Sequence, residues 1–161
     1  MKGVRFDRLA ESHLPAIMEI EKLSHGSPWS ERSFRNELDH PQGEFVVAQI
    51  GEQVIGYAGE WILADEARVT TIAVHPDHRR QGLGKELMHR LLERAVARGA
   101  VCSTLEVRAG NEAAIKLYED LGYVTAGLRK NYYPDNKEDA VVMWLYDLLS
   151  APILAEGRKG S

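Results

Sequence analysis

The sequence predicts a mixed α+β fold, in which a mostly antiparallel sheet contains one parallel pair of strands and has helices on both faces. Segments that alternate apolar and polar residues recur along the chain, and amphipathic segments of helical period separate them. Residues 66–74, 82–98 and 102–108 form a strand, a helix and a strand, a crossover unit that places its two strands parallel and adjacent. We expect a single domain over residues 1–149 and a disordered tail over residues 150–161, which are polar and small.

The first elements follow from periodicity and from capping residues. Residues 4–9 alternate as a strand, and residues 11–23 carry apolar side chains at helical spacing. Ser12 is a suitable cap for that helix, and Ser30 is a suitable cap for a second, shorter one.

A hairpin and four further strands complete the predicted sheet. Gly51 and Glu52 separate two alternating segments, which is typical of a hairpin turn. Asn111 caps a short helix that ends at Gly122. The predicted strands after the first one are residues 45–50, 54–63, 66–74, 102–108, 123–128 and 140–146.

The composition is that of an ordinary globular protein, and it limits the possible partners. Hydrophobic residues make up 44% and charged residues 27% of the chain, and the formal net charge is -4. Without a dense basic face we expect no direct nucleic-acid ligand, and no apolar run is long enough for a membrane span. The single cysteine, Cys102, fits a reducing compartment, so we expect a cytoplasmic protein. His75 and His78 have no further metal ligands beside them, and we expect no metal.

The stretch 75–85 joins the end of a strand to the start of a helix and is the candidate ligand loop. Arg79, Arg80 and Lys85 make it locally basic, and the first N–H groups of a helix favour an anion. A Walker loop is excluded because Glu86 stands where a hydroxyl is needed, and a dinucleotide fingerprint because its third glycine is missing. The local positive charge and the two glycines at the helix start, Gly82 and Gly84, favour a pyrophosphate. The alternative is an ordinary helix start with solvated arginines.

The strand over residues 102–108 has charged side chains on one face only. Leu105 and Val107 point to one side, so Glu106 points to the other. A charged face on a central strand borders a cleft, which makes Glu106 a candidate acid or base. The alternative is an ion pair of Glu106 with Arg108 or with another basic side chain.

The helix that follows this strand carries two further candidates. Tyr118 lies on its apolar stripe and is the only proton donor on that face, although a tyrosine at such a position is usually part of a core. Asn111 caps the helix whatever else it binds. Cys102 has no histidine beside it in the sequence, and we interpret it as a packing residue rather than a nucleophile.

Several of these segments occur together, in order and at the same spacing, in one family. The chain resembles the ribosomal-protein alanine N-acetyltransferases of bacteria, the RimI type within the GNAT superfamily. The resemblance covers residues 4 to about 148 and leaves out the tail. Gly110, where relatives often carry serine, is a departure that we expect to matter little. The segments that carry the resemblance are Pro28-Trp29-Ser30, residues 79–85, residues 105–111, residues 113–119, Gly122-Tyr123 and Asn131-Tyr132-Tyr133-Pro134.

The resemblance implies a GNAT acyltransferase fold whose parallel strand pair splays around acetyl-coenzyme A (acetyl-CoA), the cosubstrate. It implies that Glu106 is the general base and that Tyr118 is the general acid for the departing thiolate. It places Asn111 near the thioester end of the cofactor. The backbone groups implied for the pantetheine arm are those of Ile72, Ala73 and Val74, and the pyrophosphate residues are Arg80, Gln81, Gly82, Leu83, Gly84 and Lys85.

The leading hypothesis is therefore an N-terminal acetyltransferase that acts on the N-terminal alanine of a small-subunit ribosomal protein. Its partner is the N-terminal peptide of that protein, and the amine attacks acetyl-CoA directly in a ternary complex, without an acyl-enzyme. The α-amino pKa is about 8 and the lysine pKa about 10.4, so deprotonating a lysine costs about 3 kcal/mol more at neutral pH. The alternatives are a lysine or small-amine acetyltransferase on the same fold, and a non-catalytic acyl-CoA binding module.

Overall fold

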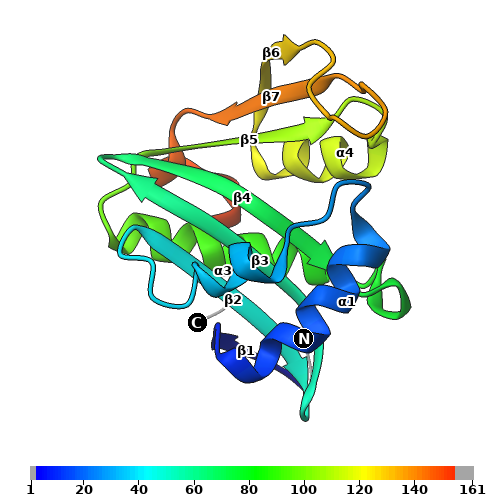
Figure 1. The fold of residues 1–161 in the computed structure, drawn as a ribbon. Helices are drawn as coiled ribbons and strands as arrows, with labels where there is room; N and C mark the ends of the chain where they lie inside the picture. Colours follow the sequence, from blue (N-terminus) through cyan, green and yellow to red (C-terminus); the bar gives the residue numbers. More distant parts are fainter. Residues whose placement is uncertain (1–2, 155–161) are drawn as a thin grey trace. The chain divides into compact units, whose positions relative to one another are not determined.

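The structure, a computed structural model, describes residues 3–154 (Figure 1). They form two compact units, which are described separately. Unit 1 comprises the residues up to Trp61 together with Thr70–Leu91, and unit 2 comprises Ile62–Val69 together with the residues from Leu92 onward. Strand β4 (Glu66–Val74) and helix α3 (Leu83–Ala97) each contribute to both units. The single domain expected over residues 1–149 stays a prediction.

Unit 1 packs helices against both faces of its strands. Tyr57 of β3 forms aromatic contacts with Phe34 of α2 and Phe45 of β2, in a core that α1 joins. The neighbouring Gly56 faces α3, because a Cβ at this glycine would lie 3.3 Å from Leu87. Successive residues of a strand point to opposite faces, so α3 and the α1–α2 core cover opposite sides. The other elements of unit 1 are β1 (Val4–Arg8), α1 (Leu14–Ser24), α2 (Glu31–Arg35), β2 (Gly43–Ile50) and β3 (Gln53–Leu63).

In unit 1 the predicted N-cap of α2 agrees with the structure, and the predicted N-cap of α1 does not. The Ser30 hydroxyl accepts the Ser33 N–H at 3.1 Å, as expected of a cap. Before α1 the chain instead forms a 3₁₀ turn over Glu11–His13. The prediction that Ser12 caps the first helix is wrong, because Nδ1 of His13 accepts a backbone N–H at this entrance (3.0 Å) and Ser12 lies inside the turn.

Unit 2 contains β5 (Cys102–Arg108), α4 (Glu112–Leu121), β6 (Val124–Arg129) and β7 (Ala140–Leu145). The start of β4 pairs with β5 in parallel, which confirms the predicted crossover unit. The pairs β5–β7 and β6–β7 are antiparallel, as are β1–β2 and β2–β3 in unit 1. Because β4 belongs to both units, the hydrogen-bonded strand order is β1-β2-β3-β4-β5-β7-β6. The predicted mixed α+β fold with a mostly antiparallel sheet is confirmed.

The packed part of unit 2 extends beyond the predicted end of the domain. A 3₁₀ turn over Leu148–Ser150 follows β7, and Ala151, Ile153 and Leu154 are at most 4% exposed. Ala151, Ile153 and Leu154 are therefore packed although they lie in the region assigned to a disordered tail, whereas Pro152 is exposed. The remainder of the predicted tail, residues 155–161, lies outside the described residues.

Candidate active site

The candidate ligand loop of unit 1 is tied to the end of the preceding strand. Arg79 donates from Nε to the Val74 carbonyl at 3.0 Å and from Nη2 to the Ser24 hydroxyl at 3.2 Å. Beyond this anchor, Arg80 and Gly82 have positive φ angles of 63° and 82°. A positive φ is uncommon for a residue with a side chain. Left-handed residues at a helix entrance build backbone concavities that bind anions.

The start of α3 fits the pyrophosphate predicted for this loop. A Cβ at Gly82 would have no neighbour within 4 Å, so the backbone is open to a ligand there. The Gly82 carbonyl accepts the first intrahelical hydrogen bond of α3 at 3.1 Å, and the N–H groups of the next three residues therefore precede the helical ladder. The side chain of Leu83 is only 2% exposed, so this residue offers its backbone alone. Arg80 and Lys85 are exposed and add positive charge.

The end of β4 provides the backbone expected to pair with the pantetheine arm. The parallel ladder joins only Glu66–Arg68 to Cys102–Thr104. Residues 72–74 belong to unit 1 and lie beyond the residues that this ladder joins. The Val74 carbonyl already accepts a hydrogen bond from the Arg79 guanidinium.

In unit 2, Glu106 lies in the middle of β5 with its side chain 20% exposed. Its Oε1 lies 3.3 Å from Nε of Arg129. The neighbouring Glu106 carboxylate and, after it, burial raise the pKa of Tyr132. The ion-pair alternative is therefore correct for the free protein, with Arg129 as the partner instead of Arg108. The Arg129 side chain is 54% exposed, and such an exposed pair is weak enough for another cation to replace it.

Tyr118 lies on α4 with 5% of its surface exposed. Its ring packs edge-on against Tyr123, whose hydroxyl is 2.7 Å from that of Ser103. Burial, followed by the proximity of Tyr133, raises the pKa of Tyr118, so its phenol stays protonated at neutral pH. Within the described residues the Tyr118 hydroxyl makes no hydrogen bond. The ring is thus part of the core, as the alternative holds, and its proton is still available to a ligand.

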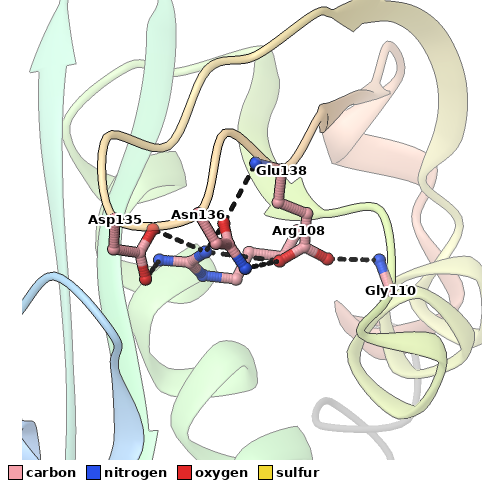
Figure 2. A network of polar contacts seen from close by, with 5 residues as sticks. All are labelled: Arg108, Gly110, Asp135, Asn136 and Glu138. Atoms are coloured by element: carbon pink, nitrogen blue, oxygen red, sulfur yellow. Dashed lines mark hydrogen bonds and ion pairs between the residues drawn. The ribbon is translucent and has the colours of Figure 1, made fainter.

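The loop between β6 and β7 is attached to the end of β5 by a network centred on Arg108 (Figure 2). Nη1 and Nη2 of Arg108 donate to the two carboxylate oxygens of Asp135, each at 3.1 Å, and Nη1 also reaches Glu138 at 3.3 Å. The flat face of the same guanidinium lies 3.9 Å from the ring centre of Tyr133. Asn136 completes the network with hydrogen bonds to both Arg108 and Glu138.

The turn after β5 contains Gly110, whose backbone N–H and missing side chain both bear on the contact with Glu138. Asn111 Oδ1 accepts the Ala114 N–H at 3.1 Å, which confirms the predicted cap of α4. One residue earlier, the Gly110 N–H donates to Glu138 Oε2 at 2.8 Å, and a Cβ at Gly110 would lie 2.7 Å from that oxygen. A side chain at residue 110 would therefore have to displace the end of the flexible Glu138 side chain, and the expectation that the departure to glycine matters little stays a prediction.

The structure distributes the predicted site residues over its two units. Unit 1 carries residues 72–74 and 80–85, and unit 2 carries Glu106, Asn111 and Tyr118. Within unit 2, Tyr133 is near both predicted catalytic groups. Burial, offset in part by Arg108 and reinforced by Glu106, raises the pKa of Tyr133 to about 12.

Sequence reasoning missed Arg129, Tyr132 and the Arg108 network. The Asn-Tyr-Tyr-Pro segment contributed to the resemblance, but no role was assigned to its tyrosines. The sequence shows two adjacent tyrosines before a loop with three acidic residues, Asp135, Glu138 and Asp139, but this composition does not show which basic side chain the loop contacts.

Other candidate chemistry finds little support in the structure. Burial, and then Glu66 and Asp65, raise the pKa of the Cys102 thiol, which disfavours the thiolate that a nucleophile needs. Across residues 3–154, no three histidine, cysteine or acidic side chains gather as metal ligands would. The absence of a metal stays a prediction. None of the described helices has the length and apolar character of a membrane span.

Comparisons with known proteins show which family the chain is similar to. Residues 14–123 match the profile of the Acetyltransferase (GNAT) family. The chain is 42% identical over 139 residues to the [ribosomal protein bS18]-alanine N-acetyltransferase of Escherichia coli K12, covering 85% of this chain and 93% of that protein. It is 36% identical over 138 residues to N-alpha-acetyltransferase RimI of Mycobacterium tuberculosis, covering 83% and 85%.

Solved structures show the same relationship. The crystal structure of the ribosomal-protein-S18-alanine N-acetyltransferase of E. coli is similar at a TM-score of 0.81 and 38% identity, covering 88% of this chain and 92% of that one. Arabidopsis thaliana NAA60, solved with acetyl-CoA, shares the fold at a TM-score of 0.81 and 17% identity, covering 88% and 97%. The match of the family profile and the identity to these relatives show that the chain belongs to the GNAT family of acetyltransferases.

Proposed function

We propose that this protein transfers the acetyl group of acetyl-CoA to the N-terminal alanine of ribosomal protein bS18. The observation that carries the proposal is the 42% identity to the E. coli enzyme of that name, which extends over 93% of that enzyme. The site chemistry supports it, since unit 2 presents a carboxylate and a protonated phenol, and unit 1 presents a basic helix entrance. The protein would meet this substrate in the cytoplasm, where ribosomal proteins are made.

The start of α3 would hold the cofactor. Backbone N–H groups after Gly82 would donate to the pyrophosphate, and Arg80 and Lys85 would neutralise its charge. Residues 72–74 would pair with the pantetheine arm through backbone groups, and Asn111 would lie near its end. Acetyl-CoA supplies the acetyl group in activated form, as a thioester.

Glu106 would accept a proton from the α-ammonium group of the substrate. In the free protein its Oε1 lies 3.3 Å from Nε of Arg129, a cation. A peptide ammonium group can take the place of the exposed guanidinium, because both are cations that bind a carboxylate. The amine would then attack directly, and no covalent enzyme intermediate is needed.

Tyr118 would donate a hydrogen bond to the departing sulfur. Because burial raises the pKa of this phenol, full proton transfer is less favourable than from an ordinary tyrosine. The proton would therefore move only as negative charge develops on the sulfur, whose thiol has a pKa of about 8.5 by analogy with cysteine.

A peptide panel tests the proposal. Three peptides are compared: the N-terminal segment of bS18 beginning with its alanine, the same segment beginning with methionine, and an N-terminally blocked segment with an internal lysine. We expect rapid turnover of the first alone, with mass spectrometry placing the acetyl group on the α-amine. Preferred acetylation of the lysine would contradict the proposal, and cofactor binding without any turnover would favour a binding module.

A further inference from the structure

We propose that Arg79 is a positioning residue for the cofactor, which latches the candidate ligand loop to the end of α1 through the Ser24 hydroxyl. This role rests on the proposed function, which places the pyrophosphate at the start of α3. It differs from the role of Arg80 and Lys85, because the Arg79 side chain holds the loop in shape and leaves the phosphates to the residues that follow.

The guanidinium of Arg79 joins the loop to two other elements of unit 1. Its Nε donates to the carbonyl of Val74, the last residue of β4, at 3.0 Å. Its Nη2 donates at 3.2 Å to the hydroxyl of Ser24, the last residue of α1, which is 55 positions away in the sequence. The planar fork of a guanidinium reaches both acceptors at once, and a lysine would keep the charge without this geometry.

The end of α1 is a fixed anchor for this latch. Glu21 lies one turn before Ser24 and is only 1% exposed. Its carboxylate accepts hydrogen bonds from the Tyr57 hydroxyl of β3 and from the Trp29 N–H, the latter at 2.9 Å. A buried polar group with its partners in place makes its surroundings rigid. Ser24 therefore offers its hydroxyl from a helix end that is itself held in place.

The loop needs such an anchor because part of its backbone is strained. The His75 N–H donates to the Ile55 carbonyl at 2.8 Å and fixes the beginning of the loop. Directly after Arg79, Arg80 has a φ of 63°. The left-handed state of a residue with a side chain is disfavoured by about 5- to 30-fold, and it persists only where the surroundings enforce it. Releasing Arg79 would let Arg80 leave this state and would move the N–H groups at the start of α3.

The effect on cofactor affinity follows from the fraction of molecules whose loop is in the binding shape. The apparent Kd rises by the same factor by which that fraction falls. The preference of Arg80 against the left-handed state limits the factor to about 30-fold. If Arg79 instead contacted the phosphates, losing the Ser24 hydroxyl would leave its guanidinium at least as available, and binding would not weaken.

The variant Ser24→Ala separates these two roles, because it removes the acceptor and keeps Arg79. We expect titration calorimetry to show a Kd for acetyl-CoA that is about five-fold higher or more, with Tm hardly moved, since alanine favours a helix. The matched control is Ser33→Ala, which removes a hydroxyl of α2 that lies 3.1 Å from that of Ser30. The control should stay within about two-fold of the unmodified protein. Unchanged or tighter binding by folded Ser24→Ala would overturn the inference.

A double-mutant cycle tests whether the two residues act together. Arg79→Lys should raise the Kd for acetyl-CoA by about 5- to 30-fold, and adding Ser24→Ala to it should change the Kd little further. The control is Arg5→Lys, because Arg5 also donates to a carbonyl, that of Gly51 at 3.2 Å, and to a side chain, that of Gln49 at 3.1 Å. It should leave the Kd within about two-fold. Equal factors for Ser24→Ala in the two backgrounds would contradict the latch.

Amide hydrogen exchange of the free protein provides a measurement without cofactor or peptide. The Glu86 N–H donates to the Gly82 carbonyl at 3.1 Å, so its exchange reports on the start of α3. Ser24→Ala and Arg79→Lys should speed this exchange, and the two controls should not; an unchanged rate would overturn the latch. If the unmodified protein binds acetyl-CoA and acetylates no peptide, the proposed function fails and these results still decide the role of Arg79. If it binds no acetyl-CoA, both fail.

Discussion

Replacing Gly82 by valine should weaken cofactor binding without unfolding the protein. Gly82 has a φ of 82°, and a residue with a side chain in the left-handed region costs about 1–2 kcal/mol. For a chain of this size that cost lowers Tm by about 2–8 °C. A Cβ at this position has no protein atom within 4 Å, so the new side chain begins in the space that we assign to the pyrophosphate. Losing one charge-assisted hydrogen bond, at about 1.5–3 kcal/mol, weakens binding by about 10- to 150-fold.

The matched control for this variant is Gly51→Val. Gly51 lies in the β2–β3 turn with a φ of 58°, and a Cβ there also meets nothing within 4 Å. Both variants should therefore lose similar stability by thermal unfolding. Titration calorimetry with acetyl-CoA should show weaker binding for Gly82→Val alone. Equal affinities in the two folded variants would refute the placement of the pyrophosphate at this helix start.

Three further predictions concern unit 2. Glu106→Gln keeps the shape of the side chain but cannot take up the proton, so turnover should fall by about 100-fold with acetyl-CoA affinity nearly unchanged; a near-normal rate at neutral pH would assign the base elsewhere. Tyr118→Phe should lower kcat by about 100-fold with Tm hardly moved, because the hydroxyl has no hydrogen bond to lose among the described residues, and a normal kcat would end its role as acid. The hydrogen bond from the Gly110 N–H lowers the pKa of Glu138; burial opposes this shift, and Arg108 adds to it. The Glu138 carboxylate therefore stabilises the fold at pH values above the ordinary carboxyl pKa of about 4.3, and this stabilisation is lost as the pH falls below that value. The Tm difference between the unmodified protein and Glu138→Gln should therefore shrink from pH 7 to about pH 3, and a constant difference would contradict this account.

The strands could be predicted because their periodicity is a local property. The predicted bounds of β4 and β5 agree with the structure residue for residue, since β-branched and alternating segments end at turn residues there. The same alternation placed Glu106 on the polar face of β5. Asn111 was predictable for a similar reason, because an N-cap bonds its own helix.

The partners of these residues could not be predicted, because they depend on how distant segments align. Arg129 reaches Glu106 only through the β6–β7 pairing, which contains an irregularity between Thr125 and Gly127. A shift of one residue in that register would turn the Arg129 side chain to the other face. Arg108 and Asp135 are 27 positions apart, and a polar loop of this composition resembles any solvated hairpin loop. The left-handed Arg80 was equally hidden, since arginine has no preference for that conformation.

The Glu138 carboxylate occupies the space that a side chain at residue 110 would fill, and this limits the substitutions that can be made at either position. Exchanging Gly110 for serine alone would place Cβ 2.7 Å from the Glu138 carboxylate oxygen and push it off the Gly110 N–H. Transplanting the loop of a relative alone, with a shorter residue at 138, would leave that N–H without its acceptor. The two positions should therefore be exchanged together, so that the N–H of residue 110 keeps an acceptor, while the Arg108–Asp135 pair still attaches the loop.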